Sequence, residues 1–373
     1  MSEEVAVGAD VTRAPRPPAE PIGGLHPTTS RLMVSLLAMV VLLGTASFLP
    51  VPYAVMSPGP ATNTLGAVNG KPLIAITGHQ TYPTTGSLDL TTVRIYGGEG
   101  VDVTLWQVVR GWLDPKVAVW PREALFPPGQ SAEQTKQENE LEMASSQETA
   151  TAAALTELGY SVGQHMQVID FADGSPAKGP VAIGDQVISV AGVAVDDGDR
   201  LRAELQKLKP GAVARLVVQR GGKQVDVSVP TTKSSTGATV LGVIVKPAFT
   251  FPFQVKIQIE DVGGPSAGTM FALGIIDKLT PGALTAGRTV AGTGIISTDG
   301  AVGPIGGIRQ KMVGAREAGA TVFLAPEGNC LGVVGHIPDG MSVVKISTLH
   351  QARQALEEIA AHGPDSPALP RCG

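Results

Sequence analysis

GPSAG at residues 264–268 and GGIRQK at residues 306–311 carry the strongest information on the fold and chemistry of this chain. Glycines surround Ser266 and an apolar run over residues 269–276 follows it, so the first stretch predicts a tight turn leading into a buried helix. A serine held at such a turn is a candidate nucleophile, and Lys311, 45 positions later, is a candidate base. The pair predicts a hydrolase of the Ser-Lys type.

Ser266 is expected at the N-terminus of this helix. Pro265 fits the first turn, because the donor that proline lacks would have no partner there. Unpaired backbone N–H groups and the positive end of the helix dipole gather at this point and would stabilise the oxyanion of an acyl-transfer intermediate. Gly263, Gly264 and Gly268 add no side chains that would keep a substrate carbonyl away.

Two lysines come into consideration as the base. Lys278 lies 12 residues along the same helix, roughly 18 Å from Ser266 at about 1.5 Å per residue, and is out of reach. Lys311 follows a Gly-Gly entry into a second predicted helix over residues 305–319, among apolar neighbours. Burial can lower a lysine pKa by as much as about 3–5 units, and a position early in a helix acts in the same direction. We therefore expect Lys311 to be the base.

The Gly-x-Ser-x-Gly pattern leaves two alternatives. It also occurs in the nucleophile elbow of α/β-hydrolases, whose esterases use a later Asp and His. His336, His350 and His362 do follow Ser266, but about 107 residues after the serine are few for that fold, and no His-Gly-Gly motif precedes it. The second alternative is a glycine-rich turn without chemistry.

Three segments together resemble the peptidase domain of Lon-type proteases. EDVGGPSAG at residues 260–268 resembles the active-site serine segment, GTG at residues 292–294 a second strand motif, and VGPIGGIRQK at residues 302–311 the lysine segment. The similarity covers about residues 250–350 and is specific as a set.

The resemblance implies roles for three side chains. Ser266 would be the nucleophile, Lys311 the general base, and Thr293 a supporting residue close to them. Ile295 stands where the family usually has glutamate, and residues 262–263 replace its Lys-Asp. The polar surroundings of the pair and the substrate preference are therefore expected to differ from those of the family.

Composition and motifs argue against several ligands. Lon proteases also carry an ATPase module, but Gly70-Lys71 and Gly222-Lys223 lack the flanking glycine and hydroxyl of a phosphate-binding loop, so no nucleotide and no other cofactor is expected. The net charge of −5, without a Lys/Arg cluster, makes nucleic acid an unexpected partner. The two cysteines, Cys330 and Cys372, exclude a zinc cluster. They either form a disulfide or stay free thiols.

Residues 164–230 have the rhythm of a small β-rich module. The predicted elements are strands at 166–169 and 187–190, a helix at 197–208, and a hairpin of strands 214–218 and 225–229. GSPA at residues 174–177, IGDQVI at 183–188 and VAG at 190–192 resemble a PDZ domain of bacterial envelope proteases. The resemblance implies a site for an extended peptide at a sheet edge. A domain that only spaces or packs against the next one is the alternative.

The N-terminal part predicts a membrane anchor. Residues 32–49 are 18 residues without a charge, long enough to span the hydrocarbon layer. Arg13, Arg16 and Arg31 precede this run, and no Lys or Arg follows for about 20 residues, which predicts a cytoplasmic N-terminus. A cleaved signal peptide is the alternative, although its apolar region is usually about 7–15 residues.

The segment between the anchor and the PDZ-like module is the least regular. Strands are expected at 93–96 and 101–105 and a helix at 131–158, and Trp106, Trp112 and Trp120 are expected in a core. Further strands at 242–245 and 255–259 are expected to open the last domain.

These predictions describe an α+β multidomain chain with a transmembrane helix, a PDZ-like β-rich module and a Lon-type α/β peptidase domain. The expected division is a disordered cytoplasmic tail at 1–30, the anchor at 31–50, an extracytoplasmic region at 51–150, the PDZ domain at 151–235 and the proteolytic domain at 240–373. The expected function is an ATP-independent serine endopeptidase of the cell membrane that cleaves envelope, secreted or unfolded polypeptides. A PDZ membrane scaffold with an inactive peptidase domain is the main rival, and family resemblance also suggests a homo-oligomer.

Overall fold

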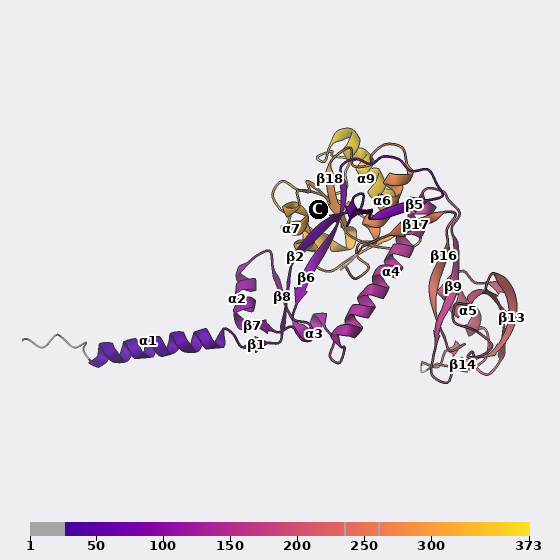
Figure 1. Cartoon of the computed structure of the whole chain (residues 1–373), viewed down its shortest axis with the longest axis horizontal. Coiled ribbons are helices and arrows are strands. Elements are labelled where there is room, and N and C mark those ends of the chain that lie inside the picture. Colours follow the sequence, from indigo (N-terminus) through magenta and orange to yellow (C-terminus); the bar gives the residue numbers. More distant parts are fainter. Residues whose placement is uncertain (1–26, 235, 260–261) are drawn as a thin grey trace, which may run out of the picture.

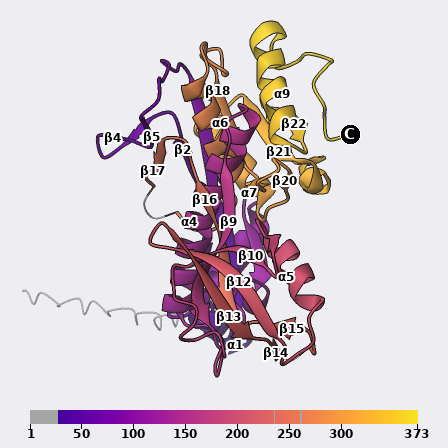
Figure 2. The same cartoon turned by 90° about the vertical axis from the view of Figure 1, so that its right-hand side faces the viewer.

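The computed structural model describes residues 27–234, 236–259 and 262–373. Most of the predicted N-terminal tail lies outside the described residues, as do Glu260 and Asp261 of the serine segment. Along its longest axis the molecule has three parts, which are a solitary helix, a larger α/β part and a smaller β-rich part (Figures 1 and 2).

The solitary helix, α1, spans Pro27–Ala46. Within it, Thr28–Ala46 is long and apolar enough to cross a membrane, and its described side chains are almost all exposed. The helix ends three residues before the end of the charge-free run, because residues 47–49 turn into the short strand β1 (Pro50–Val51).

A mixed sheet lies at the centre of the α/β part. Within the described residues its strand order is β22-β21-β18-β6-β2-β8. β6, β18, β21 and β22 are parallel neighbours, and β2 runs antiparallel to β6 and β8. Its strands are β2 (Tyr53–Asn63), β6 (Ser87–Tyr96), β8 (Ala118–Pro121), β18 (Thr289–Gly292), β21 (Val322–Pro326) and β22 (Ser342–Ile346). Strands from residues 53–121 and from residues 289–346 therefore share one sheet.

Helices cover both faces of this sheet. Successive side chains of β21 point to opposite faces, so Val322 and Leu324 belong to one buried cluster and Phe323 and Ala325 to another. The first cluster includes α4 (Ala132–Glu157), α6 (Gly268–Leu279) and α9 (Leu349–His362), and the second includes α7 (Ile308–Glu317). All residues of β21 are buried, which is typical of a strand in the middle of a three-layer arrangement.

Short elements complete the α/β part. They are β3 (Ala67–Val68), β4 (Lys71–Pro72), β5 (Ile74–Thr77), β7 (Val103–Thr104), α2 (Leu105–Leu113), α3 (Arg122–Leu125), β17 (Gln254–Ile257), β19 (Ile295–Ile296), β20 (Val302–Gly303), the 3-10 turn Glu327–Asn329 and α8 (Cys330–Val333). The strand expected at 255–259 forms as β17, paired with β5.

The strand expected at residues 101–105 is wrong in length and extent. Two residues of it, Val103 and Thr104, form β7, and Leu105 already begins helix α2. Thr104 caps this helix in a capping box, in which its hydroxyl accepts from the Gln107 backbone while the Gln107 side chain accepts from the Thr104 N–H. The cap ends the strand, because it turns the chain into the helix.

The expectation of buried tryptophans is also wrong. Trp106, Trp112 and Trp120 are 57%, 63% and 48% exposed. Helix α2 packs on its neighbours through its opposite side, where a Cβ on Gly111 would come within 2.7 Å of Val119. The close approach buries that side of the helix and leaves Trp106 and Trp112 outside, while Trp120 stands on β8 next to Val119 and points to the opposite face of that strand.

The β-rich part is an antiparallel sheet of order β13-β12-β10-β9-β16, with β11 beside β10. Its elements are β9 (Gly163–Phe171), β10 (Gln186–Val190), β11 (Val193–Ala194), α5 (Gly198–Gln206), β12 (Val213–Arg220), β13 (Lys223–Pro230), β14 (Thr232–Lys233), β15 (Thr239–Val240) and β16 (Val243–Thr250). The predicted strands, helix and hairpin of this module are confirmed. The strand expected at 242–245 belongs here as β16 rather than to the following domain, because its backbone pairs with β9.

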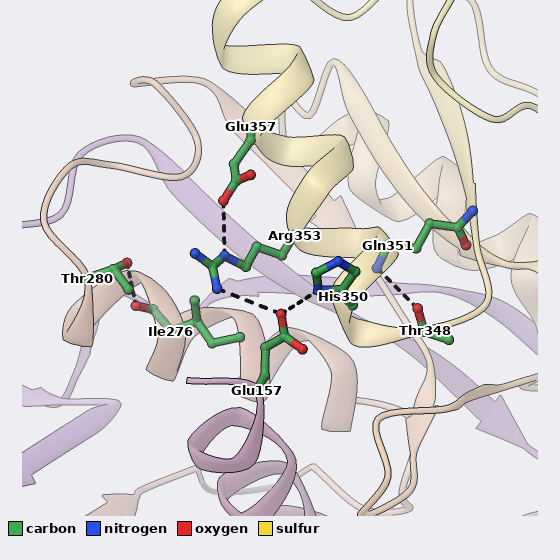
Figure 3. Close-up of polar contacts among 8 residues, drawn as sticks. All are labelled: Glu157, Ile276, Thr280, Thr348, His350, Gln351, Arg353 and Glu357. Atoms are coloured by element: carbon green, nitrogen blue, oxygen red, sulfur yellow. Dashed lines mark hydrogen bonds and ion pairs between the residues drawn. The ribbon is translucent and has the colours of Figure 1, made fainter. Parts of the chain in front are cut away.

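Helix α4 ends at the junction between the two parts. Glu157, its last residue, accepts from His350 of α9 at 2.8 Å and lies 3.7 Å from Arg353, which also contacts Glu357 (Figure 3). Thr348 caps α9 through the Gln351 N–H. The helix is thus tied to the α/β part at the point where the chain continues into β9.

Cys330 and Cys372 form a disulfide. The bond joins the start of α8 to the C-terminal tail, 42 residues apart in sequence. Of the two alternatives for the cysteines, the structure contains the pair rather than free thiols.

Candidate active site

Ser266 lies in the turn immediately before α6. The helix begins at Gly268 with Ala267 as its N-cap, so Pro265 precedes the helix instead of occupying its first turn as expected. The first amides of α6 already have partners, since Gly268 N–H donates to Pro265, Thr269 N–H to Gly294 and Met270 N–H to Ala267. The free helix amides predicted for an oxyanion are therefore not available within the described part of the chain.

Helix α4 holds this turn from one side. The Gly264 N–H donates to the Asn139 carbonyl at 3.1 Å, and the Ser146 hydroxyl donates to the Pro265 carbonyl at 3.0 Å. Gly264 has a φ of +82°, which a glycine adopts without strain. A Cβ on Gly268 would come within 2.8 Å of the Ile296 side chain. Gly264 and Gly268 thus serve backbone conformation and close packing rather than the expected access for substrate, whereas Gly263 lines a cavity at Ser266.

Lys311 reaches the serine from α7. Gly307, with a φ of +71°, is the N-cap of this helix, and the lysine stands on its first turn. The Lys311 Nζ lies 2.7 Å from the Ser266 Oγ and 3.0 Å from the Thr293 Oγ1. The side chains singled out by sequence are therefore brought together in one place, although they come from three different elements.

Burial changes the chemistry of this lysine. Lys311 is 3% exposed, and this burial lowers its pKa from 10.5 to about 8. Apolar residues of the same helix, Ile308, Met312 and Ala315, are buried with it. Lys311 is therefore neutral, and able to accept a proton, far more often than a lysine in water.

Thr293 connects the lysine to the serine backbone. It follows β18 and is fully buried, and its hydroxyl donates to the Ser266 carbonyl at 2.9 Å while accepting from the Lys311 Nζ. The next amide, Gly294 N–H, donates to the same carbonyl at 2.8 Å. Two hydrogen bonds thus fix the Ser266 carbonyl and leave its side chain directed to the lysine.

A cavity of about 280 Å³ opens beside the pair, with Ser266, Ala267 and Lys311 in its wall. The opposite wall comes from the upstream strands, with Pro60 from β2 and residues 91–94 from β6. Thr91 is also linked to the site, since its hydroxyl donates to the Gly292 carbonyl at 3.0 Å. These upstream residues were missed in the sequence, because no motif marks them and they act only through the pairing of β6 with β18.

A second hollow continues from this cavity. It has a volume of about 710 Å³, is lined by one side of α4 from Ala132 to Gln147, and shares Val262 and Gly263 with the first. Together the two hollows run from the Ser-Lys pair along α4.

The histidines that an esterase would need lie elsewhere. Among the described residues, His336 contacts the Val334 carbonyl, His350 contacts Glu157 and His362 contacts Glu358. None of them lines the cavity at Ser266. Lys278, the rejected lysine, stands in the last turn of α6, at the other end from the serine.

Two protein-family models match stretches of the chain. The Lon protease (S16) C-terminal proteolytic domain matches residues 255–361, and the PDZ domain matches residues 139–231. The first range contains Ser266, Thr293 and Lys311.

Two Lon proteases are among the similar sequences. Lon protease 1 of Bacillus subtilis is 32% identical over 151 residues, which are 39% of this chain and 19% of the relative. Lon protease 2 of the same organism is 34% identical over 103 residues, 28% of this chain and 18% of the relative. The chain thus matches about a fifth of the length of these proteins. The PDZ domain of an SdrC-like protein from Listeria monocytogenes is 18% identical, covers 22% of this chain and 86% of its own, and has a TM-score of 0.21. By these matches, residues 139–231 are similar to a PDZ domain and residues 255–361 to the proteolytic domain of Lon proteases.

Proposed function

We propose that this protein is an ATP-independent serine endopeptidase in which Ser266 is the nucleophile and Lys311 the general base. One observation carries the proposal, namely that the Lys311 Nζ lies 2.7 Å from the Ser266 Oγ while burial lowers the lysine pKa to about 8. An adjacent base is what a serine requires, because its hydroxyl is a weak nucleophile alone. The intact pair gives no support to an inactive scaffold.

The proposed reaction begins with neutral Lys311. At pH 7 a pKa of about 8 leaves roughly one molecule in ten with a neutral lysine, against about one in 3,000 at the ordinary value. The Ser266 O–H then donates to Nζ, and Oγ attacks the substrate carbonyl as the proton moves to the lysine. The ammonium returns this proton to the leaving amine, which forms an acyl-enzyme. Water, deprotonated by the same lysine, releases the product acid and regenerates Ser266.

Thr293 is proposed to position the lysine. Its hydroxyl accepts one Nζ hydrogen, which directs the nitrogen lone pair toward Ser266 when the amine is neutral. We assign the oxyanion donors to the remaining backbone amides of the turn at residues 262–267, because the first amides of α6 and the Gly264 N–H are already hydrogen-bonded and Pro265 has no N–H.

The substrates are proposed to be unfolded or extended polypeptides of the cell envelope. The hollow along α4 leads away from the Ser-Lys pair, and α4 continues into the PDZ domain, which would bind an extended chain or a C-terminus. We further propose that α1 is a single membrane anchor with the N-terminus in the cytoplasm, since Arg13 and Arg16 precede it and Arg31 lies near its N-terminal end. The region at 51–150, the PDZ domain at 151–235 and the proteolytic domain at 240–373 would then lie outside the cytoplasm, with a homo-oligomer as the expected assembly.

Cleavage without nucleotide tests the proposal. The full chain in detergent should cleave a permanently unfolded protein such as casein, at a rate that ATP and magnesium do not change. A peptide boronate should stop the reaction by forming a reversible adduct on Ser266, which native mass spectrometry should detect on the intact wild-type protein and not on Ser266→Ala. Absence of both cleavage and adduct would leave the scaffold as the better account.

The rate of cleavage should rise with pH. The base must be neutral, so kcat/KM is expected to increase about tenfold per pH unit below the Lys311 pKa and to level off above about 8. A profile of initial rates between pH 5.5 and 9.5, on a substrate without titrating groups, measures this. A plateau beginning near about pH 6.5, the ordinary histidine value, would instead indicate a histidine base.

A further inference from the structure

An exposed apolar face occupies one side of the short helix α2. Leu105, Val109, Trp112 and Leu113 lie at positions i, i+4, i+7 and i+8, so a helix brings them to one side, with Trp106 at its border. Leu113 is 79% exposed and Trp112 is 63% exposed. The opposite side of the helix, at Val108 and Gly111, is buried against the protein. A helix that hides its inner side and shows tryptophan and leucine outside lacks a partner in the described structure.

The apolar surface extends beyond α2 to residues near it in space. Phe48 and Leu49, in the segment that leaves α1, are 78% and 59% exposed. The ring of Trp112 meets Tyr53 edge-on at 6.2 Å. We call this set of side chains, Phe48, Leu49, Leu105, Trp106, Trp112 and Leu113, the aromatic belt. It contains two of the three tryptophans of the sequence, since Trp120 follows Val119, which faces α2, and so points to the opposite face of β8.

Backbone hydrogen bonds fasten the belt to the end of α1. The Leu105 N–H donates to the Leu49 carbonyl and the Trp106 N–H to the Ser47 carbonyl, both at 3.1 Å. β1, which follows at once, pairs with β7 just before α2. Figure 1 shows the consequence, since α2 lies at the end of α1 with its axis across that of α1. If α1 crosses a bilayer, α2 lies along the surface of that bilayer.

We propose that the aromatic belt inserts into the interfacial layer of the membrane that α1 spans, and so fixes the orientation of the catalytic part on that membrane. The inference rests on the membrane anchor of the proposed function. The partner that covers the belt is lipid rather than protein, because the belt is continuous with the membrane-spanning helix. The belt is also rich in tryptophan, which prefers the boundary between headgroups and acyl chains. A helix with one apolar and one protein-bound side lies flat in this layer.

The position of the belt also sets the height of the active site. β2 begins at Tyr53, next to the belt, and reaches Pro60, in the cavity wall beside Ser266, seven residues later. At about 3.3 Å per residue, this stretch of strand is at most roughly 23 Å long. The site would thus be held close to the membrane, where it meets polypeptide segments that emerge from the bilayer.

Tryptophan fluorescence tests the proposal, because two of the three tryptophans of the chain, Trp106 and Trp112, belong to the belt. The full chain is reconstituted into phosphatidylcholine vesicles, with or without bromine atoms on the acyl chains near the headgroups. We expect the brominated lipid to reduce the emission by half or more and aqueous iodide to reduce it little. Emission that brominated lipid leaves unchanged would overturn the proposal. The same holds if protection from iodide appears only at high protein-to-lipid ratio, which would mean that a second copy covers the belt.

A charged variant sharpens the test. Phe48→Glu/Leu113→Glu keeps all tryptophans and changes two highly exposed side chains, and it should reduce quenching by brominated lipid at least twofold. Ile183→Glu, at a 65% exposed position in the PDZ domain, is the matched control and should quench like the wild type. Equal quenching of the double variant and the wild type would contradict the proposal.

The outcome is separable from the peptidase activity. Cleavage of casein in detergent should be the same for the double variant and the wild type, since neither residue lines the cavity at Ser266. If the wild type fails to float with the vesicles, the anchor and the belt fail together. Cleavage in detergent still decides the proposed peptidase by itself.

Discussion

Ser266→Ala is expected to reduce cleavage of an unfolded protein by about 10⁴-fold or more, because removal of a nucleophile from a catalytic unit typically has an effect of this size. The hydroxyl is the atom that would bond to the substrate, and the 2.7 Å contact with Lys311 cannot transfer a proton without it. The turn itself should persist, since Thr293 and Gly294 hold Ser266 by its carbonyl and not by its side chain.

The measurement is release of labelled peptide from casein by full-length protein in detergent, with the unfolding midpoint taken on the same samples. Ser228→Ala is the control, because this serine is exposed on β13 of the PDZ domain. Ser266→Ala protein that folds normally and still cleaves at the control rate would remove Ser266 from the mechanism.

The pairing of Ser266 with Lys311 could be predicted because its determinants are local. The glycines of the turn, the apolar run of α6 and the Gly-Gly entry of α7 each occupy a few consecutive residues. Helix length alone excludes Lys278 as the base, since Ser266 lies just before the first turn of α6 and Lys278 stands in its last turn. The family pattern then joins the two segments, and the 2.7 Å contact agrees with it.

The walls of the site could not be predicted in the same way. β6 pairs in parallel with β18, and Thr289 stands opposite Ser87, about 200 residues away in sequence. Strand partners at such a distance leave no periodic signal, because each strand is compatible with many neighbours. The entire PDZ domain lies between these two strands in sequence, which hid the fact that residues 53–121 and 289–346 share one sheet.

The tryptophans show a different limit. Large apolar residues usually lie in a core, and the expectation for Trp106, Trp112 and Trp120 followed that rule. It assumes water on the outside of the protein. Next to a helix that can cross a membrane, an exposed apolar face needs no protein partner. Trp106 and Trp112 depart from the rule at the place where lipid is expected to replace water around the protein.

Lys311→Met is expected to abolish cleavage, by about 10³-fold or more, and at the same time to stabilise the folded protein at pH 7. Methionine resembles the lysine stem in size but cannot take a proton. The stability gain follows from the pKa, which is lowered from 10.5 to about 8 in the folded state, so below pH 8 folding must bury a charge. A pKa shift of this size corresponds to about 3 kcal/mol in the free energy of unfolding. The variant also loses the hydrogen bonds of Lys311 with Ser266 and Thr293, so we expect its free energy of unfolding to rise by a net of about 1–2 kcal/mol.

The pH dependence separates this explanation from simple repacking. The advantage of Lys311→Met should be largest below pH 8 and should shrink as the pH rises toward about 10.5, because the native lysine then folds in its neutral form. Denaturant unfolding at several pH values measures the difference. Lys278→Met is the matched control, since its side chain is partly buried in the last turn of α6 and should leave cleavage unchanged. If Lys311→Met retained full cleavage, the base would have to be another group. A loss of cleavage together with a gain in stability that disappears at high pH would instead mean that burial of Lys311 serves catalysis and lowers the stability of the fold.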